Sequence, residues 1–567
     1  MATSITRGLL KDNAAFVHKI TQTNIRTSIQ RECCISKRTI YYLSSFPSRS
    51  KNSCDIRMNS TILKPRDCIN SAVTVSLIKL SGCIQFKSTF AKATSIRFSS
   101  PSSGNISSEQ KLKFDHSSSE GILSPPPKTA PETFDNYQIA YGRKSSFELL
   151  RVFGFFFLCR FSFFTDNAVK IMGICYRILG QKMAEAVIKK AVYDQFVAGE
   201  ATDDVKRVTH QLRQGGVASI LCVPIETDDR LSTGKSKDTF LNANLEKVLA
   251  SIQLCTELGE SLAVTQFRIS ALVAGDLMKI ISDFCDQTTH NVEVITGMLD
   301  AMRGCDMNFS KLPGWADFPQ ERTEELKKGL QRLGKIQKAL EDRDVIVLID
   351  AEYMRINPAL RLLSLCLMKV CNTGYAKIFY TYQAYLKATR TNLQQDLTFA
   401  TNNGFSFGVK LVRGAYMVAE RQLAREMGYP DPVNETFELT SASYHSCLDL
   451  LLQHVATKGP PSRVRFMVAS HNEDTIRYAM DRMNDLCIPK DDPDVLFGQL
   501  YGMADHVSFT LGNQGYRVYK SVPYGPVQET LPYLARRAQE NKAILVNARR
   551  ERQLVAKALL DRLRLTA

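Results

Sequence analysis

Eight short apolar runs, rich in β-branched and aromatic residues, recur from residue 217 onward and are separated by stretches with helical periodicity. Short and almost wholly apolar runs are typical of strands buried on both faces of a parallel sheet, which need helical crossover connections. Eight is the number of strands that closes a (β/α)₈ barrel, so the pattern predicts an α/β protein with a distorted TIM-like barrel. The predicted strands are 217–225, 262–272, 345–351, 377–384, 405–412, 464–470, 495–500 and 516–523.

Other parts of the chain read as helices. Periodic apolar residues predict an N-terminal helical region over 137–213, followed by the barrel over 214–550 and a C-terminal helix over 551–567. The section 282–330 does not fit the strand–helix alternation, and we interpret it as a helical insertion after the second strand.

The net charge of +16 is concentrated at the N-terminus of the chain. Residues 1–100 have 16 basic and four acidic residues, whereas the rest of the chain has 57 basic and 53 acidic residues. The body is therefore nearly neutral, and a nucleic-acid partner is not implied.

This basic segment is rich in Ser, Thr and scattered Arg and has no apolar secretory core. Such composition is typical of a mitochondrial transit peptide, which we predict over 1–98; a disordered basic tail is the alternative. The next residues, 99–136, are rich in Ser and Pro and are interpreted as a linker.

An aromatic segment follows the predicted linker, FELLRVFGFFFLCRFSFF over 147–164. Arg151 and Arg160 interrupt it, and its apolar stretches are far shorter than the roughly 20 residues that a membrane span needs. A helix that lies on a membrane surface and a helix packed into the core both fit this pattern.

The fifteen cysteines are spread along the chain without a CxxC pair or metal-like spacing with histidines. We therefore expect reduced cysteines that serve mostly in packing, and no metal site.

Polar side chains follow the predicted strands, at the end of a parallel barrel where functional groups collect. Any one of them fits a helix cap or a satisfied core polar group, but together they indicate a functional site. They are Arg268, Asp350, Glu352, Gln383, Lys410, Arg413, Ser470, His471, Asn472, Gln499, Lys520 and Ser521.

A second feature is the arginine pair in YLARRAQEN, 533–541. Arg536 and Arg537 are adjacent on a predicted helix, and Glu540 lies one turn further, where it can hold a guanidinium. Paired guanidinium groups suit bidentate binding of a carboxylate, although a solvated charged face is the alternative.

The chain resembles the proline dehydrogenase family across about residues 345–545, and more weakly upstream through YDQFVAGE. The family's successive motifs appear here in order as LIDAEY (348–353), YQAYLK (382–387), GVKLVRGAYMVAER (408–421), VASHNEDT (468–475), FGQLYGM (497–503) and VYKSVPYGPVQETLPYLARRAQEN (518–541).

This resemblance implies a barrel with FAD over its strand ends, in agreement with the absence of a GxGxxG motif. It implies that Arg536 and Arg537 hold a substrate carboxylate, that Glu540 orients them, and that Asp350, Leu500 and Tyr533 complete the pocket. The implied flavin contacts are Gln383, Lys410, Val412, Gly414, Ala415, Tyr416, Ser470, His471, Asn472 and Gln499.

The implied reaction oxidises proline or 4-hydroxyproline, with hydride transfer from the ring carbon beside nitrogen to flavin N5 and formation of a cyclic imine. The resemblance further implies ubiquinone as electron acceptor, peripheral contact with the inner membrane, and a place on the matrix side of the mitochondrial inner membrane. A barrel that has lost activity and acts as a binding protein is the alternative, which the complete set of site residues disfavours.

Two positions depart from the family pattern. Arg268 stands where the family has Lys, so the cation is kept but its shape is not. Ser521 stands where proline-specific members have Tyr, and it offers space and a hydrogen bond for a ring hydroxyl. This resembles the hydroxyproline dehydrogenase branch; a looser pocket that still prefers proline is the alternative.

Overall fold

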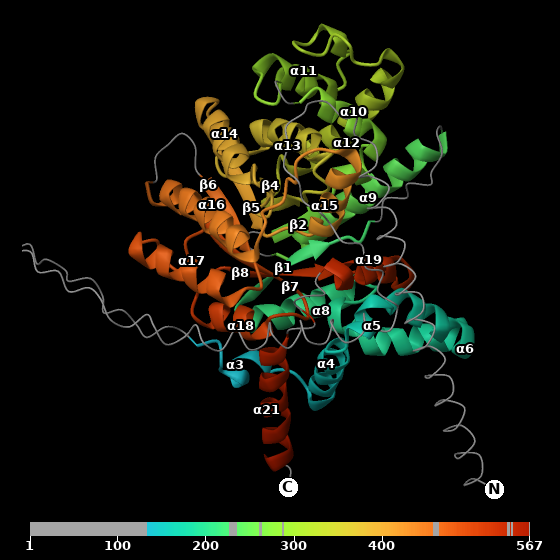
Figure 1. Cartoon of the computed structure of the whole chain (residues 1–567), viewed down its shortest axis with the longest axis vertical. Helices are drawn as coiled ribbons and strands as arrows, with labels where there is room; N and C mark the ends of the chain where they lie inside the picture. The colour runs from blue at the N-terminus through green and yellow to red at the C-terminus, as the bar shows by residue number, and fades with distance from the viewer. Residues whose placement is uncertain are drawn as a thin grey trace, which may run out of the picture. The chain divides into compact units, whose positions relative to one another are not determined.

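Eight strands, one within each predicted run, pair in parallel and in chain order to close a barrel (Figure 1). The predicted fold class is therefore confirmed. The strands are β1 (Val217–Cys222), β2 (Ala263–Phe267), β3 (Val345–Ile349), β4 (Ile378–Gln383), β5 (Phe407–Val412), β6 (Val464–Ala469), β7 (Val495–Leu500) and β8 (Val518–Pro523).

The computed structural model describes most of the chain from residue 133 onward. The predicted leader, 1–98, and the linker up to residue 132 lie outside the described residues. The described residues are 133–225, 235–259, 263–285, 288–457, 464–540, 545 and 548–565.

Burial on both faces explains why the strands are nearly continuous apolar runs. Side chains alternate along each strand, so one set packs on the surrounding helices and the other fills the barrel. Ile220, Phe379, Met467 and Tyr519 belong to the cluster inside the barrel. The register that joins β8 to β1 closes the barrel and places Ser521 opposite Ile220.

The helices that connect the strands pack against the barrel through their apolar faces. Helix α13 begins at Asn357, with a proline at its first turn, and its buried face carries Leu360, Leu363 and Leu367. The connecting helices and their close neighbours are α9 (Lys235–Glu257), α12 (Thr323–Leu340), α13 (Asn357–Cys371), α14 (Thr389–Asn402), α15 (Met417–Met427), α16 (Phe437–Thr457), α17 (Glu473–Asp485), α18 (Asp505–Asn513) and α19 (Val527–Glu540).

The section 282–330 contains helix α11 (Val292–Met302) and two short 3₁₀ turns; it follows α10 (Gly275–Asp283) and leads into α12. Its side chains are packed around Trp315, which is fully buried and stacks on Phe284 with 5.2 Å between ring centroids. His290 joins this section to α14 through a 2.6 Å contact with the buried Asp396.

The residues before the barrel are helical from Tyr137 to Arg213, and the last helix, α21, covers Arg549–Leu565. Phe134 is fully buried, so the packed part of the chain begins before the predicted end of the linker at residue 136. The N-terminal elements are α3 (Tyr137–Tyr141), α4 (Ser146–Cys159), α5 (Ser162–Asp166), α6 (Ala168–Ile188), the π-turn η1 (Lys189–Tyr193), α7 (Asp194–Phe196) and α8 (Thr202–Arg213).

Helix α21 packs beside α3 and α4 in a separate apolar cluster that includes Leu149, Phe156, Leu554 and Val555. In Figure 1 the two ends of the described chain meet below the barrel, where α21 stands between α3 and α4. These elements also contact the loop after β7, because Met503 belongs to the same cluster.

Candidate functional site

A cavity of about 930 Å³ opens at the carboxyl ends of the barrel strands. It is lined by the final residues of the strands, by the loops that follow them, by α19, and by the first turn of α21. Of the strand-end residues predicted for the site, Glu352 and Lys520 do not line this cavity. All but one of the residues assigned to the substrate or the cofactor do line it. They are Arg268, Asp350, Gln383, Lys410, Val412, Gly414, Ala415, Tyr416, Ser470, His471, Asn472, Gln499, Leu500, Ser521, Tyr533, Arg536 and Arg537.

The exception is Glu540. Helix α19 ends at Glu540, but the side chain lies outside what the structure describes. The role assigned to Glu540 therefore stays a prediction.

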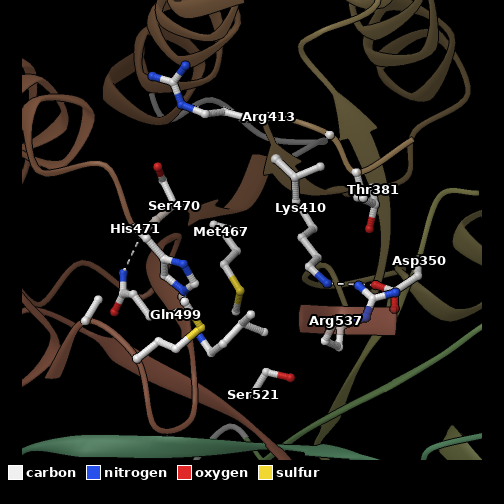
Figure 2. Close-up of a pocket in the computed structure, with 18 of the residues that line it drawn as sticks. Asp350, Thr381, Lys410, Arg413, Met467, Ser470, His471, Gln499, Ser521 and Arg537 are labelled. Atoms are coloured by element: carbon white, nitrogen blue, oxygen red, sulfur yellow. Dashed lines mark hydrogen bonds and ion pairs between the residues drawn. The ribbon is translucent and has the colours of Figure 1, made fainter. Parts of the chain in front are cut away.

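One wall of the cavity is strongly charged. Lys410 Nζ, on β5, donates to Asp350 Oδ1 at 2.7 Å, and Asp350 directly follows β3 (Figure 2). Burial alone would raise the pKa of Asp350, but Lys410, Arg268 and Arg537 together hold that pKa below its usual value. Asp350 is therefore an anion at neutral pH, surrounded by three cations.

Helix α19 brings its arginines to this wall. Arg537 lies beside Asp350 in Figure 2, and its guanidinium sits 5.5 Å from the centre of the Tyr533 ring. Tyr533 is buried, and its hydroxyl accepts a hydrogen bond from the Cys222 thiol at 3.6 Å. Helix α19 thus presents Arg536 and Arg537 to the cavity, and Arg537 lies over the ring of the buried Tyr533.

Two amide side chains at the ends of strands, Gln383 on β4 and Gln499 on β7, also line the cavity. Gln383 Nε2 donates to the Glu352 carbonyl at 2.9 Å, whereas Gln383 Oε1 is buried without a partner in the described part of the chain. Gln499 Nε2 donates to the Ser470 carbonyl at 3.2 Å, and Gln499 Oε1 accepts from Ser508 at 2.9 Å. Both ends of the Gln499 amide therefore have a partner, whereas Gln383 keeps an acceptor for a ligand.

His471 is fixed in one tautomer. The backbone N–H of Leu500 donates to His471 Nε2 at 2.9 Å, so the ring proton lies on Nδ1. Burial, helped by Lys520 and His506, lowers the pKa of His471 to about 3. His471 is thus a neutral hydrogen-bond donor on the cavity wall, and Asn472 after it caps α17 by accepting from the Thr475 N–H at 2.8 Å.

The turn after β5 carries the small residues of the site. Gly414 has φ = 128°, which an L side chain rarely adopts. A Cβ there would also lie 1.5 Å from the Tyr385 ring. Glycine is therefore required at this position by the Tyr385 ring. Tyr416 OH, two residues on, lies 3.5 Å from Arg268 Nη2.

Arg413 is a cavity residue that the resemblance did not assign. Its guanidinium donates to Ser441 at 3.0 Å and Thr475 at 2.9 Å, and it stacks 4.7 Å from the Phe437 ring. Among the described residues no carboxylate lies within ion-pair distance of Arg413. The sequence placed Arg413 among the polar residues at the strand ends. Nothing in the sequence indicated that it could bind an anion.

Ser521 lies inside the cavity, across from Arg413 in Figure 2. It is buried, and its hydroxyl has no hydrogen-bond partner within the described residues. A buried hydroxyl without a partner is costly, so a ligand group is the natural partner for it.

Residues near the two ends of the described part of the chain close one side of the cavity. Arg550, at the start of α21, lines the cavity and pairs with Glu473 and, at 2.8 Å, with Asp135. Glu551 also lines the cavity, and its carboxylate accepts from Tyr141 at 3.4 Å. Sequence reasoning missed these residues because nothing local indicates that segments so far apart meet here.

The part of the chain that the structure describes contains no group of three or more His, Cys, Asp or Glu side chains able to hold a metal ion. No helix within the described ranges is long and apolar enough to cross a membrane.

Comparison with known proteins gives consistent matches. Residues 229–550 match the family model described as "Proline dehydrogenase". Hydroxyproline dehydrogenase of Xenopus laevis is 39% identical over 421 residues, which cover 74% of this chain and 88% of that protein. Human proline dehydrogenase 1, mitochondrial, is 30% identical over 552 residues, covering 77% and 91%. Proline utilization A of Bdellovibrio bacteriovorus aligns with a TM-score of 0.49 and 21% identity, over 72% of this chain and 38% of that one.

Proposed function

Because this chain belongs to the proline dehydrogenase family, we propose that it is an FAD-dependent dehydrogenase that oxidises 4-hydroxyproline, with L-proline as the alternative substrate. The observation that carries the choice of substrate is the buried Ser521 hydroxyl, which faces the cavity and has no partner among the described residues.

The cavity residues fit FAD. The volume of about 930 Å³ lies within the usual range for ligand sites, roughly 300–1,000 Å³. The free acceptor on Gln383 and the donor on His471 suit the polar edge of a flavin ring, and Arg413 suits a phosphate. The residues that would hold FAD are Gln383, Lys410, Val412, Arg413, Gly414, Ala415, Tyr416, Ser470, His471, Asn472 and Gln499.

When bound, FAD would supply a two-electron acceptor for a hydride. The chain's own contribution is to bind and orient the substrate. Arg536 and Arg537 would hold its carboxylate as a bidentate pair, and their helix fixes the distance between that carboxylate and the strand ends. The substrate ammonium would release one proton to solvent water, and the resulting amine would lose a hydride from the ring carbon beside nitrogen. This gives a protonated cyclic imine, which becomes the neutral imine when it releases the remaining N–H proton to water.

Asp350 would act on the substrate nitrogen. Its carboxylate is an anion because Lys410, Arg268 and Arg537 offset its burial. An anion there attracts the substrate ammonium, while the three cations keep Asp350 from binding a proton itself. Tyr533 and Leu500 would exclude water from the pocket.

A hydroxyl on the substrate ring would complete the hydrogen bonding of Ser521. The backbone of β8 fixes the position of Ser521, and Ile220 lies opposite it on β1. Names of relatives also support this choice: the Xenopus laevis protein named for hydroxyproline is 39% identical, compared with 30% for human proline dehydrogenase 1.

The test is steady-state turnover of the FAD-loaded protein with a soluble quinone analogue, comparing L-proline and trans-4-hydroxy-L-proline. We expect a higher kcat/KM for hydroxyproline. Ser521→Ala should lower that value about tenfold, because it removes a hydrogen bond to the ring hydroxyl, and leave proline turnover nearly unchanged. Ser521→Tyr should reverse the preference. A wild-type preference for proline, unaffected by Ser521→Ala, would reject hydroxyproline as the main substrate.

The proposal includes ubiquinone as electron acceptor and a place on the matrix side of the mitochondrial inner membrane. The basic residues 1–100 and the mitochondrial names of several relatives support this location. Import of the full chain into isolated mitochondria, with loss of an N-terminal segment, is the expected result.

A further inference from the structure

The segment 193–199, YDQFVAG, lies between α6 and α8, outside the barrel strands. None of the described residues before β1 lines the cavity. The segment nevertheless contacts the loop after β7 and the loop after β8. Leu500 ends β7, and the loop after β8 leads into α19, so both loops adjoin residues of the proposed substrate pocket.

Three hydrogen bonds hold the 193–199 segment to the loop between β8 and α19. The Ala198 N–H donates to the Pro523 carbonyl at 2.9 Å. The Gly525 N–H donates to the Gly199 carbonyl at 2.9 Å, and the Tyr193 hydroxyl donates to the Gly525 carbonyl. Tyr193 is fully buried at the end of the π-turn η1, and π-helical turns are often found at functional sites. The backbone that leads into α19 is therefore fixed from outside the barrel.

The same segment holds the loop after β7. Gln195 is buried, and its Nε2 donates to the Gly502 carbonyl at 3.1 Å. Gly502 has φ = 79°, and a Cβ at this position would lie 2.3 Å from the Gln195 carbonyl oxygen. The segment and the loop are thus in direct backbone contact, two residues after Leu500, which lines the cavity.

Side chains of the 193–199 segment also pack on α19. Tyr193 and Val197 belong to one apolar cluster with Leu531 and Tyr533 of that helix. This packing matters because α19 contains Pro532, which has no N–H to donate to the preceding turn. The half of the helix that carries the arginines therefore depends on its contacts for a fixed position.

We propose that the 193–199 segment positions α19 relative to the loop after β7, and thereby sets the place of the substrate carboxylate. Tyr193 and Gln195 are its positioning residues, because they reach the two loops while neither side chain lines the cavity. The inference rests on the proposed function, in which Arg536 and Arg537 bind that carboxylate. A small shift of α19 is enough to weaken binding of a ligand that a guanidinium fork holds.

Tyr193→Phe tests the contact with the loop after β8, because it removes the hydroxyl and keeps the ring in its apolar cluster. The measurement is the inhibition constant of cyclopentanecarboxylate with the FAD-loaded full chain. This ring carboxylate has no nitrogen and cannot be oxidised to an imine. We expect the constant to rise about fivefold, which corresponds to the loss of one hydrogen bond. The flavin content of the variant should match that of the wild type.

The matched control is Tyr444→Phe. Tyr444 is also fully buried, and its hydroxyl donates to the Leu411 carbonyl at 3.0 Å. Leu411 is held within the sheet between β4 and β6, so this variant should leave the inhibition constant unchanged. Gln195→Met keeps the length of the side chain but loses its donor to the loop after β7, and it should raise the constant as Tyr193→Phe does.

Hydrogen exchange of the α19 amides measures positioning without a ligand. We expect faster exchange over Val527–Glu540 in Tyr193→Phe, but not in Tyr444→Phe. Equal exchange and equal inhibition constants in these two variants would overturn the proposal, because the segment would then only support the fold. A wild type that cyclopentanecarboxylate does not inhibit, with faster α19 exchange in Tyr193→Phe, would instead reject the proposed function and reduce the segment to an anchor of α19.

Discussion

His471 shows how a single residue is held in one protonation state. Its Nε2 accepts the Leu500 N–H, and burial lowers its pKa to about 3. The folded protein therefore binds no proton at His471 between pH 3 and the ordinary histidine value of about 6.5, while the unfolded chain does. The stability that depends on neutral His471 is complete above pH 6.5 and is lost as the pH falls.

His471→Gln should flatten this dependence. The glutamine oxygen can still accept from Leu500, but it does not titrate. We expect the free energy of unfolding, measured in urea, to fall less between pH 6.5 and pH 4.5 in the variant than in the wild type. His210→Gln changes an exposed histidine on α8 and should follow the wild-type curve. Parallel curves for His471→Gln and wild type would contradict the assignment of a neutral, buried ring.

The arginine pair leads to a prediction about binding of the substrate carboxylate. If Arg537 binds the substrate carboxylate as a fork, Arg537→Lys keeps the charge but loses the second hydrogen bond. We expect kcat/KM for the amino acid to fall about thirtyfold, with little change for the corresponding amide, which has no carboxylate. Equal losses for acid and amide would show that Arg537 supports the fold of the pocket and does not bind the carboxylate.

At the scale of elements, β8 is tied to the loop after β7 by a buried cation. Lys520 is fully buried; its Nζ lies 2.8 Å from Asp505 Oδ1 and donates to the carbonyls of Leu500 and Met503. Asp505 also pairs with Lys144, before α4, at 3.1 Å. Burial would raise the pKa of Asp505, but the two lysines hold it well below its usual value.

Lys520→Met should destabilise the protein by about 3 kcal/mol, because it leaves Asp505 and two carbonyls buried with fewer partners. Lys144→Met breaks a partly exposed pair with the same carboxylate and should cost about 1 kcal/mol. Urea unfolding of both variants measures the difference. A loss for Lys144→Met as large as that for Lys520→Met would mean that the outer pair, and not the buried one, holds the loop.

An element could be predicted from the sequence when the faces that it buries determine its pattern of apolar residues. The strands were predictable because both of their faces are covered, which makes runs such as Val345–Ile349 wholly apolar. Their order then placed Asp350, Lys410 and Gln499 at one end of the barrel. The ion pair of Lys520 with Asp505 and the place of Arg550 beside the cavity could not be predicted, because their partners lie on elements that meet only in the folded chain. The tautomer of His471 depends on a backbone N–H and was equally beyond prediction.

At the scale of the whole molecule, the two ends of the described chain stabilise each other. Leu554 and Val555 on α21 are buried against α4, and Arg550 reaches Asp135. The same contacts cover one side of the cavity, so folding of the terminal helices and completion of the site are coupled.

Leu554→Ala should therefore cost about 3 kcal/mol of stability, as expected for a buried leucine. Leu560→Ala, at an exposed position on the same helix, should cost little. Thermal unfolding compares the two, and proteolysis near residue 550 should increase only in Leu554→Ala. Equal stability of the two variants would mean that α21 does not pack as described.

Strand β8 separates two tasks in adjacent residues. Lys520 faces the loop it secures, while Ser521 faces the cavity, because successive side chains of a strand point to opposite sides. The residue at position 521, and with it the preference among ring-substituted substrates, can therefore change during evolution without disturbing the ion pair between Lys520 and Asp505. A barrel built in this way can change its substrate specificity while keeping its melting temperature.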